Sequence, residues 1–208
     1  MKEYTKIQTL FKRDMSNKGR IIEGEWSLPE FDYLKKNAWL FTEKVDGTNI
    51  RVNVSDGNIQ FGGRTDAAQI PSMLLVELNK LFTHEKLLRS FDCDLADVTL
   101  YGEGYGAKIQ NGGKYRNDQS FVLFDVLIGD WWLQRKDVED VANKLGIDVV
   151  PIVGVGTLTE AIELVRNGMK STWGDFISEG LVLRPSVELK TRGGNRIIGK
   201  IKHRDFNG

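Results

Sequence analysis

The sequence has few of the residues that build disulfides, metal centres or membrane spans. Cys93 is the only cysteine among 208 residues, which excludes an intrachain disulfide and a cysteine-rich zinc site. The only two histidines, His84 and His203, are too scattered to indicate a histidine-based metal site. No apolar run is long enough to cross a bilayer, and residues 1–6 lack the apolar core of a signal peptide. We therefore expect a cytoplasmic protein with no membrane partner.

The chain also lacks an excess of charge of either sign. Its 29 Lys and Arg residues balance 29 Asp and Glu residues, which removes the simplest argument for nucleic-acid binding, a global basic excess. The imbalance is local, because residues 190–204 include several lysines and arginines and no acidic residue. A cluster of this kind, taken alone, is more typical of a solvated face than of a binding site.

The apolar periodicities predict an α+β fold with mostly antiparallel sheets and flanking helices. Ser55-Asp56-Gly57-Asn58 lies between two strand-like segments and predicts a hairpin with a type I′ turn. Capping-box spacing predicts helix starts at Ser27–Glu30 and Thr157–Glu160. Buried strands are expected at 98–102, 121–128, 180–184 and 196–202. No composition break marks a boundary, so we expect a single domain over residues 1–208.

The most informative segment is Glu43-Lys44-Val45-Asp46-Gly47, a strand that ends in a lysine and a tight turn. A lysine becomes a nucleophile when neighbouring cations or desolvation disfavour its charged form. Lys200 and Lys202 alternate along a later strand and therefore share one face of it. They could act in this way on Lys44, and they could hold phosphates as point charges. A surface lysine beside an ordinary turn, and an edge strand protected by charge, are the simpler alternatives.

Three further segments carry groups that a nucleotide site would use. Glu103 lies among glycines, where a ligand can approach the backbone, and its carboxylate could accept from ribose hydroxyls or from a metal-bound water. Glu179 precedes a buried strand and could be a magnesium ligand. Phe121 and Phe124 lie in an apolar strand, and one ring could stack on a base, although such residues usually belong to the core. A β-bulge with an exposed glutamate would equally explain the segment around Glu103.

In their order along the chain, these segments resemble the covalent nucleotidyltransferase superfamily of ligases and capping enzymes. In that resemblance Lys44–Gly47 is motif I, Glu103 lies in motif III, 121–126 is motif IIIa, 179–182 is motif IV and 200–202 is motif V. The match extends from about Glu43 to Lys202. It implies the nucleotidyltransferase (adenylyltransferase) domain of the ATP-grasp-like DNA/RNA ligase fold.

Within the superfamily, the chain looks most like the type 2 RNA ligases. Motif I continues into Thr48-Asn49, where DNA ligases and capping enzymes usually carry arginine in place of Asn49. Arg64 resembles the arginine that this branch uses to contact phosphate. Little sequence follows Lys202, so we expect neither an OB-fold nor a C-terminal accessory domain. A protein partner could replace the missing part.

The resemblance implies ATP-dependent joining of 5′-phosphate and 3′-hydroxyl RNA ends, as in RNA repair. Lys44 would form a lysyl-AMP, AMP would pass to the 5′-phosphate, and the 3′-hydroxyl would displace it. ATP would be the AMP donor and Mg²⁺ or Mn²⁺ the metal, with nicked duplex or single-stranded RNA as the substrate. A DNA ligase-like adenylyltransferase, a GTP-using capping enzyme and a non-catalytic RNA-binding module on the same fold stay open as alternatives.

The resemblance also assigns roles to individual residues. Lys44, Lys200 and Lys202 are the expected catalytic residues. The expected nucleotide-binding residues are Glu43, Asn49, Arg64, Glu103, Phe121 (with Phe124 as the fallback for stacking), Glu179, Lys200 and Lys202. Glu179 and Glu103 are the expected metal-site residues.

Overall fold

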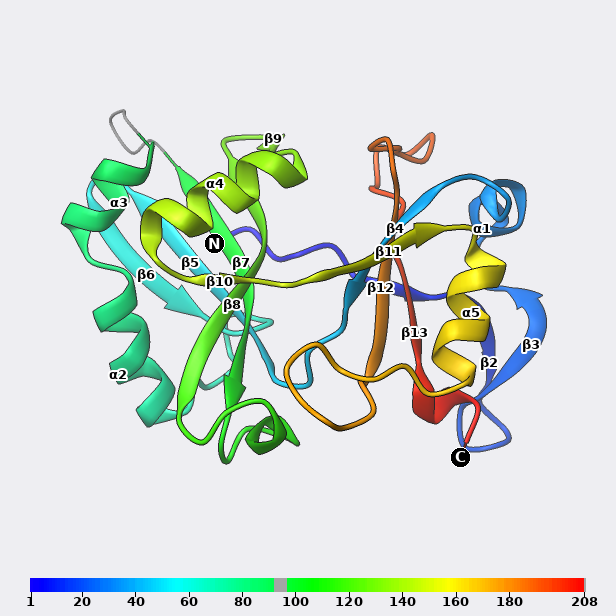
Figure 1. Ribbon diagram of the computed structural model, residues 1–208. Helices are drawn as coiled ribbons and strands as arrows, with labels where there is room; N and C mark the ends of the chain where they lie inside the picture. Colours follow the sequence, from blue (N-terminus) through cyan, green and yellow to red (C-terminus); the bar gives the residue numbers. More distant parts are fainter. Residues whose placement is uncertain (92–96, 208) are drawn as a thin grey trace. The chain divides into compact units, whose positions relative to one another are not determined.

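The structure, a computed structural model, describes residues 1–91 and 97–207, so Cys93 lies outside the described residues. The chain folds into two compact units (Figure 1). Unit 1 consists of Met1–Tyr4 and Asp46–Val150, and unit 2 consists of Thr5–Val45 and the chain from Pro151 onward. The single nucleotidyltransferase domain over residues 1–208 stays a prediction.

Unit 1 is built on a sheet with the strand order β10-β8-β7-β5-β6, and β9 also pairs with β8. The neighbouring strands are antiparallel except for β10 and β8, which run parallel. The hairpin between β5 and β6 turns at Asp56 and Gly57, whose φ angles of 49° and 74° confirm the predicted turn. The strands are β5 Thr48–Ser55, β6 Asn58–Gly62, β7 Val98–Gly106, β8 Gln119–Ile128, β9 Trp131–Trp132 and β10 Asp148–Val149.

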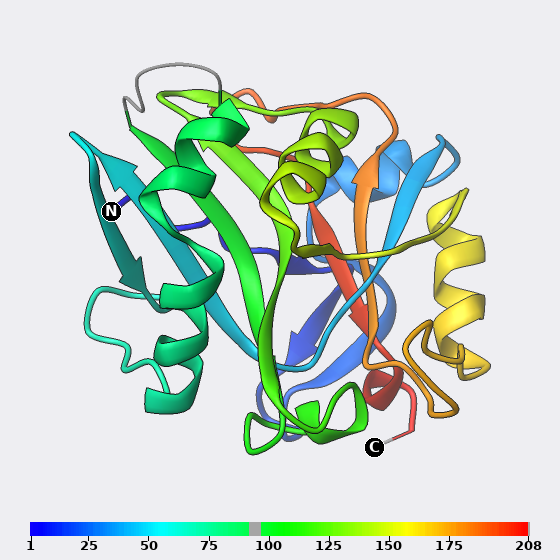
Figure 2. The same ribbon diagram turned by 60° about the vertical axis from the view of Figure 1, so that its left-hand side comes forward.

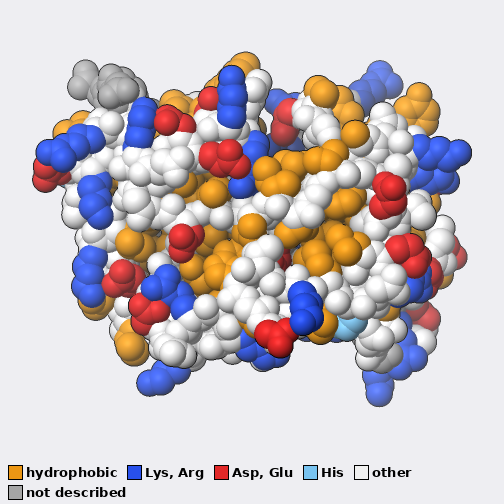
Figure 3. Space-filling model, in the orientation of Figure 1, with side chains coloured by type: hydrophobic (Ala, Val, Ile, Leu, Met, Phe, Trp, Pro, Cys, Tyr) orange, Lys and Arg blue, Asp and Glu red, His pale blue; other side chains and the backbone are white. Residues whose placement is uncertain are grey.

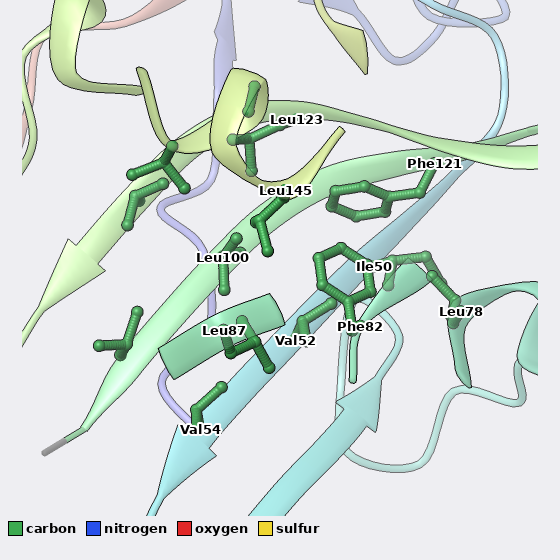
Figure 4. Close-up of a cluster of buried hydrophobic side chains, with 14 of the residues drawn as sticks. Ile50, Val52, Val54, Leu78, Phe82, Leu87, Leu100, Phe121, Leu123 and Leu145 are labelled. Atoms are coloured by element: carbon green, nitrogen blue, oxygen red, sulfur yellow. The ribbon is translucent and has the colours of Figure 1, made fainter. Parts of the chain in front are cut away.

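Three helices cover one face of this sheet (Figure 2). They are α2 Ser72–Leu81, α3 His84–Phe91 and α4 Arg135–Leu145, and a short 3-10 helix, η1 Gly112–Lys114, lies between β7 and β8. Leu78, Leu87 and Leu145 from the helices form one buried cluster with Ile50 and Leu100 from the strands (Figure 4). This cluster is the core of unit 1.

The opposite face of the same sheet carries polar side chains. Successive residues of a strand point to opposite faces, so the burial of Ile50 in the core places Asn49 and Arg51 on the other side. The register pairs Asn49 with Glu103 and Arg51 with Tyr101 on the neighbouring strand β7. Two of the predicted site residues, Asn49 and Glu103, are therefore cross-strand neighbours.

Unit 2 contains a sheet with the order β1-β13-β12-β4-β11 and a separate hairpin of β2 and β3. Within the sheet, β1 runs parallel to β13, and the other neighbouring strands are antiparallel. Its strands are β1 Gln8–Thr9, β4 Trp39–Glu43, β11 Ile152–Gly156, β12 Gly180–Pro185 and β13 Gly199–Lys202, and the hairpin strands are β2 Phe11–Asp14 and β3 Arg20–Trp26.

The helices of unit 2 pack around a second core. They are α1 Pro29–Leu34 and α5 Leu158–Arg166, with the 3-10 helix η2 His203–Asp205. Phe31 of α1 and Ile162 of α5 belong to one buried cluster with Phe41, Leu181 and Ile201 from the sheet. The sheet that bears the predicted lysines is thus held by apolar packing.

The two predicted capping boxes have different outcomes. At α5, Thr157 Oγ1 accepts from the Glu160 N–H (3.2 Å), and the Glu160 carboxylate accepts from the Thr157 N–H (2.6 Å), which confirms the prediction. At α1 the prediction is wrong, because the N-cap is Leu28 and has no side-chain cap. The Ser27 hydroxyl donates to the Thr9 carbonyl instead, so it serves tertiary structure rather than the helix end.

The mostly antiparallel sheets and flanking helices confirm the predicted α+β class. On the face drawn in Figure 3, Lys and Arg side chains are interspersed with Asp and Glu side chains. Within residues 1–91 and 97–207, no helix is both long and apolar enough to span a membrane.

Candidate functional site

Lys44 directly follows strand β4 and is fixed through both its backbone and its side chain. Its N–H donates to the Gly180 carbonyl at 2.9 Å, and its Nζ donates to Oε2 of Glu179 at 2.6 Å. Nζ of Lys202 forms an ion pair with the other carboxylate oxygen, Oε1, also at 2.6 Å. The side chains of Lys44, Glu179 and Lys202 are only 20%, 13% and 15% exposed. These three predicted residues therefore form one partly buried cluster in unit 2.

The strand order explains how the sequence assembles this cluster. β12 lies between β4 and β13, and the register pairs Leu181 with Glu43 and Gly180 with Lys202. A Cβ at Gly180 would collide with the Ile201 carbonyl and lie 2.7 Å from Cα of Lys202. The two residues at 179–180 are thus required for separate structural reasons. The carboxylate of Glu179 binds the lysines, and the missing Cβ of Gly180 lets β13 approach.

Glu179 places one negative charge between two positive ones. The expectation that Lys202 disfavours the charged form of Lys44 did not include a carboxylate, and here that of Glu179 lies between them. Attraction in a partly desolvated site is stronger than in bulk water and offsets the repulsion between the ammonium groups. Lys200 lies two residues before Lys202 on β13 and is half-buried. Because alternate residues of a strand share one face, Lys200 and Lys202 lie on the same side of β13.

Glu43, the residue before Lys44, is a buried carboxylate with one free oxygen. Its exposed fraction is 1%, and its Oε2 accepts from the Thr172 N–H (2.8 Å) and the Thr172 hydroxyl (2.9 Å). Oε1 has no hydrogen-bond partner among the described residues. A buried acceptor without a donor is costly, so Oε1 marks a place where a donor is expected. Thr172 lies far from Glu43 along the chain, and no motif of the sequence indicated it.

In unit 1, the turn after Lys44 lies against the strand that carries Glu103. A Cβ on Gly47 would collide with the Gly104 carbonyl and lie 2.8 Å from Cγ of Glu103. Only glycine permits this approach. Asn49 follows on β5 and is paired in register with Glu103. The Asp-Gly turn of motif I, Asn49 and Glu103 are thus brought together within unit 1.

Phe121 is a core residue, and the prediction that its ring stacks on adenine is wrong. The side chain is 0% exposed and packs edge-on against Phe82, with ring centroids 5.2 Å apart (Figure 4). The register pairs Phe121 with Gly104 and Val122 with Glu103, so Phe121 faces away from Glu103. The fallback residue, Phe124, is half-buried and lies outside this core cluster.

Arg64 lies two residues beyond the end of β6 and is exposed. Among the described residues it has no hydrogen bond or ion pair. The neighbouring residues Gly63 and Asp66 are both held by the guanidinium of Arg51, at 2.7 and 2.8 Å. Arg51 was not a predicted site residue. No local pattern indicated its partners.

The Gln110–Arg116 loop contacts the Asp46-Gly47 turn of motif I. From its sequence alone, this loop could be an RNA-binding loop or a plain connection between strands. Nδ2 of Asn111 donates to Oδ2 of Asp46 at 2.8 Å, and the hydroxyl of Tyr115 accepts from the Asp46 N–H at 3.2 Å. The loop therefore fixes both the backbone and the side chain of Asp46. These contacts join residues far apart in sequence, so no local pattern could have indicated them.

The polar face of the unit 1 sheet also binds the first residues of the chain. Arg51 Nη1 donates to the Met1 carbonyl (3.1 Å), and the Tyr101 hydroxyl donates to the Lys2 carbonyl (3.0 Å). Burial raises the pKa of Tyr101 to about 12, so the hydroxyl remains a donor at neutral pH. The N-terminal residues are therefore part of the surroundings of Arg51.

The donor set fits a divalent metal that arrives with a nucleotide better than one held by protein alone. Among the described residues no group of three or more His, Cys, Asp or Glu side chains could hold a metal ion. Both oxygens of Glu179 are engaged by lysines. Magnesium is often bound by one or two carboxylates together with substrate phosphates, and Glu179 can provide one such carboxylate.

A comparison with protein families decides the family of the chain. The family described as RNA ligase matches residues 37–202, a range that includes every predicted site residue. The chain belongs to the RNA ligase family. Among curated proteins no match was found.

Solved structures of an RNA ligase from Naegleria gruberi share the fold of this chain. Naegleria gruberi RNA ligase with PPi is 18% identical, with a TM-score of 0.65 over 96% of this chain and 57% of that one. A mutant of the same enzyme with ATP and Mn is 17% identical, with a TM-score of 0.65 over 98% of this chain and 63% of that one. An apo mutant of the same enzyme is 17% identical, with a TM-score of 0.67 over 99% of this chain and 58% of that one. The chain thus spans about three fifths of the length of these neighbours.

Proposed function

We propose that this chain is an ATP-dependent RNA ligase of the type 2 branch, which joins 5′-phosphate and 3′-hydroxyl ends through a lysyl-AMP on Lys44. The observation that carries the proposal is the cluster of Lys44, Glu179 and Lys202 in a member of the RNA ligase family. The Naegleria gruberi structure with ATP and Mn supports the choice of nucleotide and of a divalent metal.

In the first step, Nζ of Lys44 attacks the α-phosphorus of ATP. A P–N bond forms, the P–O bond to pyrophosphate breaks, and the amine loses a proton. A protonated amine cannot attack, so the proton must leave Nζ first. Oε2 of Glu179, 2.6 Å away, is within the distance of direct proton transfer. Nζ of Lys202 is paired with the other carboxylate oxygen, Oε1.

The nucleotide is bound by groups from several strands. Lys200 and Lys202 attract its phosphates as point charges. Oε1 of Glu43, which lacks a donor among the described residues, accepts from the amino group of adenine. Glu103 accepts from the ribose hydroxyls, and Phe124 takes the stacking role that Phe121 cannot fill.

The later steps transfer AMP to RNA. The 5′-phosphate oxygen of one RNA end attacks the phosphorus of the lysyl-AMP, the P–N bond breaks, and the Lys44 nitrogen takes back the proton held by Glu179 and leaves as an amine. The 3′-hydroxyl of the other end then loses its proton to solvent and attacks that 5′-phosphate, and AMP leaves. Asn49 and Arg64 hold the reacting phosphate, since positioning and charge stabilisation dominate phosphoryl transfer.

Mg²⁺ or Mn²⁺ would be held by Glu179 and the nucleotide phosphates, and Glu103 of unit 1 is proposed as a further metal-site residue. When bound, such an ion neutralises charge on the phosphate oxygens.

The proposal is tested by incubating the protein with each α-labelled nucleoside triphosphate and a divalent metal, followed by a denaturing gel. We expect label on the protein from ATP, and not from GTP, because the capping-type alternative would use GTP. Labelled protein is then given nicked RNA and nicked DNA, and we expect sealing of RNA. RNA binding without any labelled protein would favour the non-catalytic alternative, and preferential sealing of DNA would favour the DNA ligase alternative.

A further inference from the structure

Arg51 is a fully buried arginine that the proposed reaction leaves without a role. Its side chain is 0% exposed, and its guanidinium donates to three groups at once. Nε donates to the Gly63 carbonyl (2.7 Å), Nη1 to the Met1 carbonyl (3.1 Å) and Nη2 to Oδ1 of Asp66 (2.8 Å). Burying a charge is expensive unless it is paired and hydrogen-bonded, and here the rigid fork of the guanidinium is well satisfied.

Two of these contacts lie on either side of Arg64. Gly63 precedes it and Asp66 follows two residues later, so Arg51 fixes the loop that presents the Arg64 side chain. The loop is tightly packed, because a Cβ on Gly63 would lie 2.8 Å from Cβ of Ala68. Arg64 itself is exposed and has no hydrogen bond or ion pair among the described residues. Its donors are therefore available to a ligand.

The negative charge of Asp66 links this arrangement to phosphate binding by Arg64. Its side chain is 74% exposed and lies two residues from the arginine proposed to bind phosphate. Without Arg51, this carboxylate would repel an anionic phosphate and would compete for Arg64 by forming an ion pair with it. With Arg51, its charge is matched by a buried guanidinium, and one of its oxygens is already engaged.

We propose that Arg51 is a positioning residue that holds Asp66 and the Gly63 carbonyl so that Arg64 stays available for the terminal 5′-phosphate of RNA. This inference rests on the proposed function, because it concerns the RNA end that the ligase would use. A purely structural arginine would stabilise the loop without affecting the recognition of a phosphate.

The experiment compares the affinity for one RNA oligonucleotide with a 5′-phosphate and with a 5′-hydroxyl. The ratio of the two affinities, the phosphate preference, isolates the phosphate contact. We expect a preference in the natural protein, and its loss in Arg64→Ala. Arg51→Gln should lower the preference about tenfold, the equivalent of about 1.4 kcal/mol.

The decisive variant is the double substitution Arg51→Gln with Asp66→Asn. Removing the carboxylate should restore most of the preference lost in Arg51→Gln, a rescue that a merely structural role would not produce. Asp56→Asn, at the tip of the same β-hairpin, is the matched control for removing one acidic charge and should leave the preference unchanged. An unchanged preference in Arg51→Gln, or a double variant no better than the single one, would overturn the proposal.

Thermal unfolding shows whether Arg51→Gln folds. If it does not fold, Arg51→Lys is used instead, because an ammonium keeps the charge but lacks the guanidinium fork. Asp66→Asn should then restore the phosphate preference lost in Arg51→Lys, and failure to restore it would overturn the proposal. Failure of the proposed function has a separate signature, which is absence of lysyl-AMP in the natural protein. The phosphate preference is a binding measurement and can be read in either case.

Discussion

Nζ of Lys44 lies 2.6 Å from Oε2 of Glu179, and this ion pair joins the end of β4 to the start of β12. The same carboxylate also binds Lys202 through its other oxygen. One acidic residue therefore controls two of the three lysines of the proposed site. Removal of this carboxylate should therefore affect both lysyl-AMP formation and the stability of the protein.

Glu179→Gln should slow formation of the lysyl-AMP about 100-fold or more, because an amide can neither take the proton of Lys44 nor balance both ammonium groups. The free energy of unfolding should fall by about 2 kcal/mol, the usual scale for lost charged hydrogen bonds in a partly buried site. Single-turnover labelling with ATP and thermal unfolding measure the two effects. Glu163→Gln, on the exposed side of α5, is the control and should change neither. Normal labelling by Glu179→Gln would remove Glu179 from the mechanism.

Gly47→Ala should destabilise the protein by about 1–3 kcal/mol, the range for overpacking. The added Cβ would collide with the Gly104 carbonyl, and backbone cannot move aside as a flexible side chain can. Gly113→Ala is the matched control, because the nearest heavy atom to its Cβ among the described residues beyond its own turn is Cα of Ala107, at 3.9 Å. Chemical denaturation of both variants gives the comparison. Equal stability of the two would show that the turn does not need a glycine.

Phe121→Ala should lower the free energy of unfolding by about 3–5 kcal/mol, as expected for emptying a core site that also packs against Phe82. Where Phe121 is replaced by Leu, which keeps the core filled, the KM for ATP should stay close to that of the natural protein. Phe124→Leu should instead raise this KM about fivefold or more, since stacking on a base contributes about 1–3 kcal/mol. A higher KM in Phe121→Leu alone would restore the stacking role to Phe121.

Much of unit 2's lysine cluster could be predicted from order and spacing. Lys44, Glu179 and Lys202 lie at strand ends, and the register of three antiparallel strands brings strand ends together. The sequence could not indicate which lysines pair with Glu179. The expectation that neighbouring lysines act on Lys44 did not include the carboxylate that lies between Lys44 and Lys202.

The error at Phe121 has a simple geometric cause. The alternation of a strand places Phe121 and Phe124 on opposite faces, but it could not tell which face of the sheet the helices cover. Only the packing of α2 to α4 decides that. The same limit applies to Arg51 and Thr172, whose partners lie far away in the chain and leave no local pattern.

The central claim is that Lys44 becomes covalently bonded to AMP. It is tested most directly by mass spectrometry of peptides from protein incubated with ATP and a divalent metal. Lys44→Arg is the negative variant, because a guanidinium is not deprotonated in proteins, and Lys36→Arg, an exposed lysine of unit 2, is the matched control. We expect one added adenylate on Lys44 in the natural protein and in Lys36→Arg, and none in Lys44→Arg. An adenylate on another residue, or its absence under all these conditions, would contradict the account.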